Sequence, residues 1–250
     1  IKYIMKNIYP NIIKFNSKNL NKVIKTLKKN GIISLPTETV YGLAGNAYSN
    51  SSIKKIFKIK RRLKKNPLII HYYRLDDAKK DVVLNQNFYK IYKRFSPGPI
   101  TYILNKKKNS RIKSLACANL NTVGIRFPKN IIIKKILKKL NFPLAMPSAN
   151  KSSGVSPVKP SDVSEEFNNK VKVVDGGISK IGIESTVINL VGKTSILRPG
   201  IITPKELEKA LKIKIKISSK HKTIKSPGSM KKHYSPGLPI YLNSSKCPDK

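Results

Sequence analysis

The sequence predicts an α/β fold, a twisted mixed sheet with packed helices, and three observations support this prediction. Short apolar runs of strand length alternate with segments whose apolar residues recur at helical spacing. Gly and Pro clusters separate these segments. Hydrophobic residues make up 39% of the 250 residues, which is enough for a core. We therefore expect one large domain over residues 1–212, followed by a Lys-, Ser- and Pro-rich linker or tail over 213–250.

Helical periodicity locates the expected helices. Apolar residues recur at helical spacing within 17–27, and Ser17 is the expected N-cap. A second amphipathic helix contains Ile53 to Phe57, with Asn50 or Ser51 as its cap. The remaining expected helices are 86–95, 131–140 and 203–211, the last one opened by a capping box of Thr203 and Glu206.

Short apolar runs bounded by turn residues locate the expected strands. The run at 31–35 ends at Pro36 and is too short for a helix, so we expect a buried strand. The polar stretch PTETVYGLAG that follows is expected to form a loop with a Gly-containing turn. Further strands are expected at 67–73, 100–104, 122–127, 142–149, 171–174, 185–190 and 195–198.

The charge is strongly unbalanced, with 52 Lys and Arg against 12 Asp and Glu and a formal net charge of +40. Such a charge favours an anionic partner, such as RNA or a nucleotide. The lysines are spread along the chain rather than gathered in one block, so a drift in overall composition explains them as well. The charge therefore supports an anionic ligand without identifying it.

Two classes of protein are disfavoured. No apolar run approaches the roughly 18 residues of a membrane-spanning helix. Cys117 and Cys247 are isolated, which argues against a thiolate zinc site and suits a reducing compartment. We therefore expect a cytoplasmic protein that has no membrane partner.

Polar residues gather at four places where chemistry is conceivable. Thr39 follows the strand at 31–35, where ligands often bind in open α/β sheets. Lys60 and Arg62 alternate in KIKRR, so in an extended segment both could face one phosphate. Ser148 and Asn150 alternate in PSAN in the same way. Ser185 begins a strand after a Gly-rich stretch, and Arg198 ends a strand just before a turn.

Each of these places also has a purely structural interpretation, as a polar loop, a solvated helix end or an ordinary serine turn. The sequence contains no GxSxG elbow, no HExxH pair and no GxxxxGK[ST] phosphate loop. Composition and spacing alone therefore indicate an α/β protein with a small anionic ligand held by scattered cations.

In their order along the chain, eight segments resemble the YrdC-like L-threonylcarbamoyladenylate synthase family. The segments are PTETVYGL (36–43), KIKRR with NPLIIH (58–71), SPGPIT (96–101), TVGIRFP (122–128), PSAN (147–150), DGG (175–177), IESTVINL (183–190) and LRPG (197–200). The stretch SPGSMKKHYSP (226–236) resembles the linker of the long form, whose C-terminal domain we expect to be absent or truncated here. Leu63 and Ser96 depart from the pattern, which commonly has proline and tryptophan there.

The resemblance implies a YrdC-like fold and a nucleotidyltransferase reaction. L-threonine, bicarbonate and ATP would give threonylcarbamoyl-AMP and pyrophosphate, with Mg²⁺ accompanying ATP. Other proteins would then transfer the threonylcarbamoyl group to tRNA. The alternative is a non-catalytic module of the same fold that binds double-stranded RNA or tRNA, which the charge favours.

The resemblance also implies site residues. Lys60 and Arg62 would be catalytic. The residues expected to bind L-threonine are Thr39, His71, Arg126, Ser148 and Ser185. The residues expected to bind ATP are Lys60, Arg62, Asn66, Thr122, Asn150, Ser156, Arg198 and Tyr234, the last reaching over the nucleotide from the linker.

Overall fold

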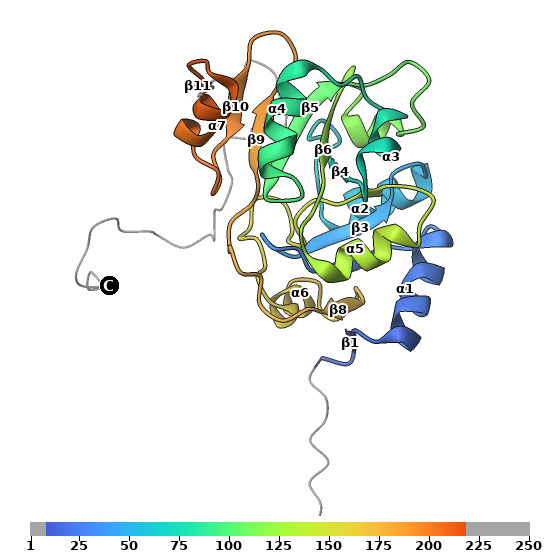
Figure 1. Ribbon diagram of the computed structural model, residues 1–250. Coiled ribbons are helices and arrows are strands. Elements are labelled where there is room, and N and C mark those ends of the chain that lie inside the picture. The colour runs from blue at the N-terminus through green and yellow to red at the C-terminus, as the bar shows by residue number, and fades with distance from the viewer. Residues whose placement is uncertain (1–8, 219–250) are drawn as a thin grey trace, which may run out of the picture.

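A mixed sheet of eleven strands organises residues 9–218, the part of the chain that the computed structural model describes (Figure 1). The strand order is β1-β8-β2-β3-β7-β4-β6-β5-β9-β10-β11. The strands are β1 (Ile12–Lys14), β2 (Ile33–Leu35), β3 (Gly42–Asn46), β4 (Ile69–His71), β5 (Ile100–Asn105), β6 (Thr122–Arg126), β7 (Leu144–Ala145), β8 (Val173–Asp175), β9 (Thr186–Asn189), β10 (Ser195–Arg198) and β11 (Lys216–Ile217).

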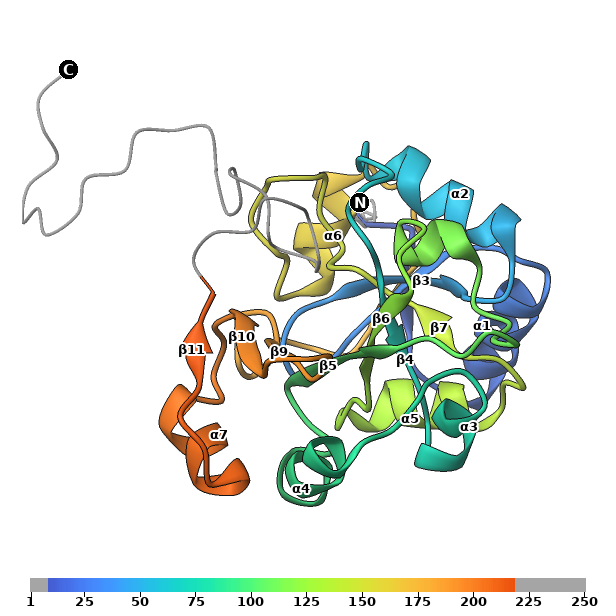
Figure 2. The ribbon, with the colours of Figure 1, turned by 90° about the horizontal axis from the view of Figure 1, so that it is seen from above.

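Helices cover both faces of the sheet, as Figure 2 shows for α2 and α5. Side chains of α1 and α5 share one buried cluster with β2, β7 and β8, and α2, α4, α6 and α7 contribute to a second, larger cluster. The helices are α1 (Ser17–Lys28), α2 (Asn50–Ile59), α3 (Leu75–Lys79), α4 (Gln86–Phe95), α5 (Ile131–Lys138), α6 (Pro160–Glu166) and α7 (Pro204–Leu211), with a 3-10 turn at Ser114–Cys117. The predicted mixed α/β sheet with packed helices is therefore confirmed.

Strand directions reverse in the middle of the sheet, and this decides where a site can form. β2 is antiparallel to β3, β3 to β7, and β7 to β4, whereas β4 and β6 are parallel. β2 and β4 consequently run in opposite directions. Measured along the strands, the carboxyl end of β2 and the carboxyl end of β4 lie at opposite ends of the sheet. A pocket that collects residues from both ends must extend across a face of the sheet.

Helix caps show where local sequence signals were correct and where they were wrong. The capping box of Thr203 and Glu206 opens α7 as predicted. The cap of α1 is Asn16, whose side chain accepts a hydrogen bond from the backbone of Asn19, and not Ser17. The cap of α2 is Ser49, and neither Asn50 nor Ser51. In both cases the first polar residue of a polar run is the cap, so the helix starts one residue earlier.

The strand predictions were less complete. The expected turn around Gly42 is instead the start of β3, which pairs with β2 and β7 and is buried on both faces. The long strand expected at 142–149 shortens to β7, because Pro143 and Pro147 flank it. The short helices α3 and α6 and the edge strands β1 and β11 were not predicted.

Two further findings concern residues 9–218. No helix in this range is long and apolar enough to cross a membrane. Cys117 is buried and unpaired with another cysteine, and burial raises its pKa to about 11, so its thiol is protonated at neutral pH.

Candidate active site

A small pocket gathers residues from six separate segments of the chain. Its cavity measures about 30 Å³. Ile69 and His71 are two residues apart on β4, so their side chains leave the same face of the sheet and both line the pocket. All five residues expected to bind L-threonine line it together with Arg198: Thr39, His71, Arg126, Ser148 and Ser185.

Arg126 is held in place by three groups. Its Nη2 donates to Glu38 Oε1 at 2.7 Å, its Nη1 donates to Thr39 Oγ1 at 2.9 Å, and its Nε contacts the Gly98 carbonyl at 3.3 Å. Both members of the Arg126–Glu38 ion pair are largely buried, with exposed side-chain fractions of 5% and 13%. Because a guanidinium has five N–H groups, Arg126 keeps two for a ligand.

Glu38 connects this arginine to the start of α5. Its second oxygen accepts hydrogen bonds from the backbone N–H groups of Lys129 at 3.0 Å and Asn130 at 3.1 Å. Burial alone would raise the pKa of Glu38, but Arg126 and these N–H groups outweigh it and lower the pKa below its ordinary value. Glu38 is therefore ionised and fixes the position of Arg126.

A second buried ion pair lies on the other side of the pocket. Arg198 Nη1 pairs with Glu184 Oε2, while its Nε and Nη2 donate to the Ser185 carbonyl at 3.1 and 2.9 Å. Ser156 Oγ donates to the other Glu184 oxygen at 3.0 Å. The Ser185 hydroxyl lies 2.8 Å from Thr101 Oγ1. A turn brings the chain back across β9 here, and a Cβ at Gly200 would lie 2.4 Å from the Thr186 nitrogen, so only glycine fits.

Lys60 is buried and turned towards the PSAN segment. Its Nζ donates to the Ser148 carbonyl at 2.5 Å and also to the Asn150 carbonyl. Burial, with a smaller contribution from the nearby Arg62 charge, lowers the pKa of Lys60 to about 7. Lys60 does not line the small pocket, so its direct effect is to join the end of α2 to the loop after β7.

The expected extended arrangement of Lys60 and Arg62 was wrong. Lys60 is the C-cap of α2 in helical conformation and Arg61 has a φ of 49°, so the chain turns there. Arg62 faces the next segment, where it donates to the Asn66 carbonyl at 3.0 Å, Asn66 Oδ1 at 2.7 Å and the Pro67 carbonyl at 2.7 Å. Burial lowers the pKa of Arg62 to about 10, and it remains a cation.

Thr122, Asn150 and Tyr234 are the remaining residues expected to contact ATP. Thr122 begins β6 and pairs with Asn105 of β5. Asn150 donates through Nδ2 to the Lys151 and Gly154 carbonyls, and it does not line the small pocket with Ser148, contrary to the expectation that both face one cavity. Tyr234 lies outside the described residues.

Neutral and acidic groups complete the site. Burial and the nearby Arg126 charge lower the pKa of His71 well below its usual value, so the imidazole is neutral. The Thr37 and Thr39 hydroxyls lie 2.8 Å apart. Within residues 9–218 no group of three or more His, Cys, Asp or Glu side chains is placed to hold a metal ion.

The structure adds two carboxylates that sequence reasoning did not assign to the site. Glu38 and Glu184 each stand inside a quoted motif, directly before Thr39 and Ser185. The signal that could have found them is their scarcity, because only 12 residues of the chain are acidic and both precede a predicted ligand residue. Each forms an ion pair with a pocket arginine.

The fold and the pocket define a class of α/β protein in which buried, ion-paired arginines surround a small polar cavity on the face of a mixed sheet. A family model described as "Telomere recombination", for Sua5, YciO and YrdC, matches residues 25–200. A model described as "Threonylcarbamoyl-AMP synthase, C-terminal domain" matches residues 202–250. The chain therefore belongs to the Sua5/YciO/YrdC family. The tail that we expected to be a linker lies within the residues that match this C-terminal domain model, and the boundary at residue 212 stays a prediction.

Curated relatives carry the name threonylcarbamoyl-AMP synthase. The one from Pyrococcus abyssi is 35% identical over 225 residues, covering 86% of this chain and 65% of the relative. The one from Bacillus subtilis is 33% identical over 234 residues, covering 91% and 67%. This chain thus spans about two thirds of the length of these relatives, and slightly less for the first.

Solved structures agree with this family. P. abyssi Sua5 complexed with L-threonine is 33% identical and superposes with a TM-score of 0.85, covering 89% of this chain and 68% of that one. Escherichia coli YciO is 20% identical with a TM-score of 0.68, covering 78% and 97%, and this likeness supports the fold alone.

Proposed function

We propose that this chain forms threonylcarbamoyl-AMP and pyrophosphate from L-threonine, bicarbonate and ATP. The observation that carries the proposal is the convergence of Thr39, His71, Arg126, Ser148 and Ser185 on one pocket. The names of the P. abyssi and B. subtilis relatives point to the same reaction, and a related protein was solved with L-threonine.

The threonine carboxylate would bind Arg126. Two N–H groups of this guanidinium remain after Glu38, Thr39 and Gly98 are satisfied, and two parallel N–H groups match a carboxylate. Ser148 and Ser185 would contact the polar groups of the amino acid from the opposite side. The neutral His71, whose ring contacts the backbone of Ile69 and Leu144, lines the pocket without adding charge beside Arg126.

The triphosphate would bind near Arg62 and Arg198. Arg198 and Ser156 surround Glu184, and the charge of Glu184 also reaches Lys60 and Arg62. We assign Arg62 and Arg198 to phosphate oxygens, and Lys60 to the loop that carries Ser148 and Asn150. Asn66 accepts hydrogen bonds from Arg62, Thr122 begins β6, and Tyr234 would approach the nucleotide from the linker.

The reaction requires the protein to position the two substrates, and it needs no covalent intermediate on the protein. The threonine amine captures bicarbonate or carbon dioxide as a carbamate. A carbamate oxygen then attacks the α-phosphorus in line, and the bond to pyrophosphate breaks. Arg62 and Arg198 would neutralise the charge that develops on the phosphates and leaving group, together with the Mg²⁺ that enters with ATP. Downstream partners would be the proteins that transfer the threonylcarbamoyl group to tRNA.

The decisive experiment measures pyrophosphate after incubation with ATP, Mg²⁺ and bicarbonate, with and without L-threonine. Threonine-dependent release is expected, and its absence in a folded chain would refute the synthase. Arg62→Ala should lower the rate tenfold to a hundredfold, because one charge-assisted contact contributes about 1.5–3 kcal/mol. The exposed neighbour Lys64→Ala is the matched control and should retain the rate.

The net charge of +40 supports one other candidate, an RNA-binding module without catalysis. That module predicts salt-sensitive binding of double-stranded RNA or tRNA and no threonine-dependent pyrophosphate. RNA binding would leave the convergence of hydroxyls and paired arginines in one pocket without a purpose, so the synthase is the better proposal.

A further inference from the structure

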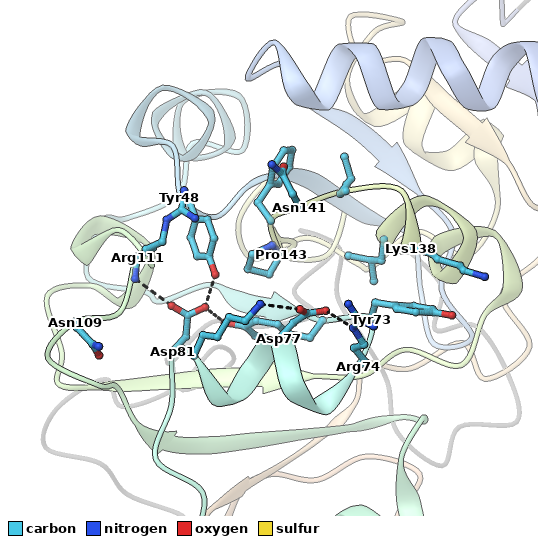
Figure 3. Close-up of a pocket in the computed structure, with 15 residues that line it drawn as sticks. Tyr48, Tyr73, Arg74, Asp77, Asp81, Asn109, Arg111, Lys138, Asn141 and Pro143 are labelled. Atoms are coloured by element: carbon cyan, nitrogen blue, oxygen red, sulfur yellow. Dashed lines mark hydrogen bonds and ion pairs between the residues drawn. The ribbon is translucent and has the colours of Figure 1, made fainter.

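Networks of hydroxyl groups lie in two separate cavities of residues 9–218. One cavity is the candidate active-site pocket. The other, which we call the α3–α5 cleft, measures about 590 Å³ and shares no lining residue with the pocket. Its walls are α3, the end of α5, the segments after β3 and β4, and the loop after β5 (Figure 3). In each network a group that can only accept hydrogen bonds fixes the direction of the hydroxyl protons.

Asp81 is this acceptor in the cleft. It is 1% exposed, and one of its oxygens accepts hydrogen bonds from the hydroxyls of Tyr48 at 2.5 Å and Tyr72 at 2.8 Å (Figure 3). The other oxygen accepts from the Ser110 hydroxyl at 2.7 Å and the Arg111 backbone N–H at 3.0 Å. Because a carboxylate only accepts, all three hydroxyls donate to it. The network of the cleft is therefore closed on itself.

Thr37 and Thr39 form the corresponding network in the pocket. Thr37 is 3% exposed, and its Oγ1 lies 2.7 Å from the Val40 carbonyl oxygen and 2.8 Å from Thr39 Oγ1. The carbonyl oxygen carries no proton, so the Thr37 hydroxyl donates to it. The proton between the two threonines must then belong to Thr39. The backbone N–H groups of Thr39 and Val40 also donate to Thr37 Oγ1, at 3.1 and 3.2 Å.

The direction of this network leaves Thr39 as an acceptor. The Thr39 hydroxyl donates its single proton to Thr37 and accepts a hydrogen bond from Arg126 Nη1 at 2.9 Å. A hydroxyl oxygen can accept two hydrogen bonds, so one position remains. Thr39 lines the pocket, and a group that enters there would meet an oxygen that accepts and cannot donate. The pocket network is thus open on the side of the ligand.

We propose that Thr37 is a positioning residue, which makes Thr39 accept a hydrogen bond from the amino group of bound L-threonine. The inference rests on the proposed function, in which the threonine carboxylate binds Arg126. Thr39 contacts this arginine, and the amino group is attached to the carbon next to the carboxylate, so the amino group is the donor within reach. A hydroxyl that donated instead would occupy the lone pair of the amine. That lone pair must attack the carbon of bicarbonate or carbon dioxide.

The test is equilibrium binding of L-threonine to the whole chain, measured by calorimetry. Thr37→Val removes the group that orients Thr39 and should weaken binding roughly threefold to tenfold, the effect of one neutral hydrogen bond. Thr37→Ser keeps the hydroxyl, and its affinity should stay within about twofold of wild type. The matched control is Tyr48→Phe, which loses a hydroxyl of the α3–α5 cleft and should also stay within about twofold.

Two comparisons separate a positioning role from a general effect on folding. The double variant Thr37→Val with Thr39→Val should bind L-threonine no more weakly than Thr39→Val alone, because Thr37 acts through Thr39. The analogue (R)-3-hydroxybutanoate, which lacks the amino group, should bind equally to wild type and to Thr37→Val in a competition assay. In wild type this analogue should bind more weakly than L-threonine, a measurement that needs no variant.

Three results with the variants would overturn the proposal: additive losses in the double variant, no rescue by Thr37→Ser, or an equal loss of affinity for L-threonine and the analogue in Thr37→Val. Equal affinity of wild type for L-threonine and the analogue would also overturn it. A wild-type chain that binds no L-threonine would refute the proposed function, and this inference with it.

Discussion

The candidate active-site pocket and the α3–α5 cleft both contain arginines, but the arginines have different partners. In the pocket Arg126 and Arg198 are buried and each forms an ion pair with a glutamate. In the cleft Arg111 is exposed and rests on a tyrosine ring, and Lys138 has no acidic partner in residues 9–218.

This difference teaches what the few acidic residues of the chain do. Of 12 in the sequence, Glu38 and Glu184 stand beside pocket arginines and Asp81 organises the cleft. A carboxylate beside a buried arginine fixes its geometry at a high desolvation cost, whereas an exposed cation keeps its charge available for an incoming anion. Variants can test whether the pocket arginines depend on their glutamate partners and whether the cleft cations do not.

The largest effect is expected for Arg198→Ala. Removing one partner of a buried ion pair takes the Arg198 contact from the buried Glu184, and breaking such a pair typically costs about 3–5 kcal/mol. The midpoint of denaturant unfolding should fall accordingly, and pyrophosphate release should be lost. Arg111→Ala is the matched change in the cleft and should cost less than about 1 kcal/mol. Similar losses in the two variants would contradict the comparison.

Lys60 is expected to change the free energy of unfolding by a few kcal/mol as the pH changes. Its pKa is about 7 in the folded chain and near 10.5 in the unfolded chain, so the unfolded state binds more protons between these values. Stability contributed by this residue should therefore rise as the pH rises from 7 to 10. Unfolding curves of wild type and Lys60→Met over that range provide the measurement, and parallel curves would show that the ammonium is not buried as described.

A smaller effect is expected for Glu38→Gln. The glutamine amide keeps the shape of the glutamate side chain, but the negative charge that faces Arg126 is lost. The free energy of this charge-assisted contact, about 1.5–3 kcal/mol, should be reduced. The KM for L-threonine should increase more than the KM for ATP. Asp77→Asn breaks an exposed pair in the cleft and serves as control, since such pairs contribute about 0–1 kcal/mol. Equal changes in both KM values would mean that Glu38 acts only on folding.

The smallest effect is expected for Tyr48→Phe. The ring under Arg111 is kept and only the hydroxyl that donates to Asp81 is lost, so stability should fall by roughly 1–2 kcal/mol. Thermal unfolding measures the change. Threonine-dependent pyrophosphate release should remain at the wild-type rate, because residues that share no partners act additively. A reduced rate would show that the two regions are coupled.

Much of the fold followed from the sequence because its signals are local. The helix at 86–95 and the strand at 195–198 were predicted to the residue, where periodicity and turn residues agree. β3 was missed because GLAGN has little β propensity and becomes a strand only through its partners β2 and β7. Short edge strands such as β1 have too few residues to show periodicity.

The site was predictable from motifs, but its connections were not. Thr39 and Ser185 line the pocket as the resemblance implied, although 146 positions separate them in the chain. The contact of Lys60 with the PSAN carbonyls depends on the turn at Arg61, which no local pattern announced. The α3–α5 cleft was not predicted at all, because its residues belong to no motif and meet only through the tertiary fold.

One carboxylate fixes two parts of the molecule. Glu38 accepts hydrogen bonds from the backbone of the two residues before α5, and it forms an ion pair with Arg126 in the pocket. The start of this helix and the guanidinium therefore keep a fixed position relative to each other.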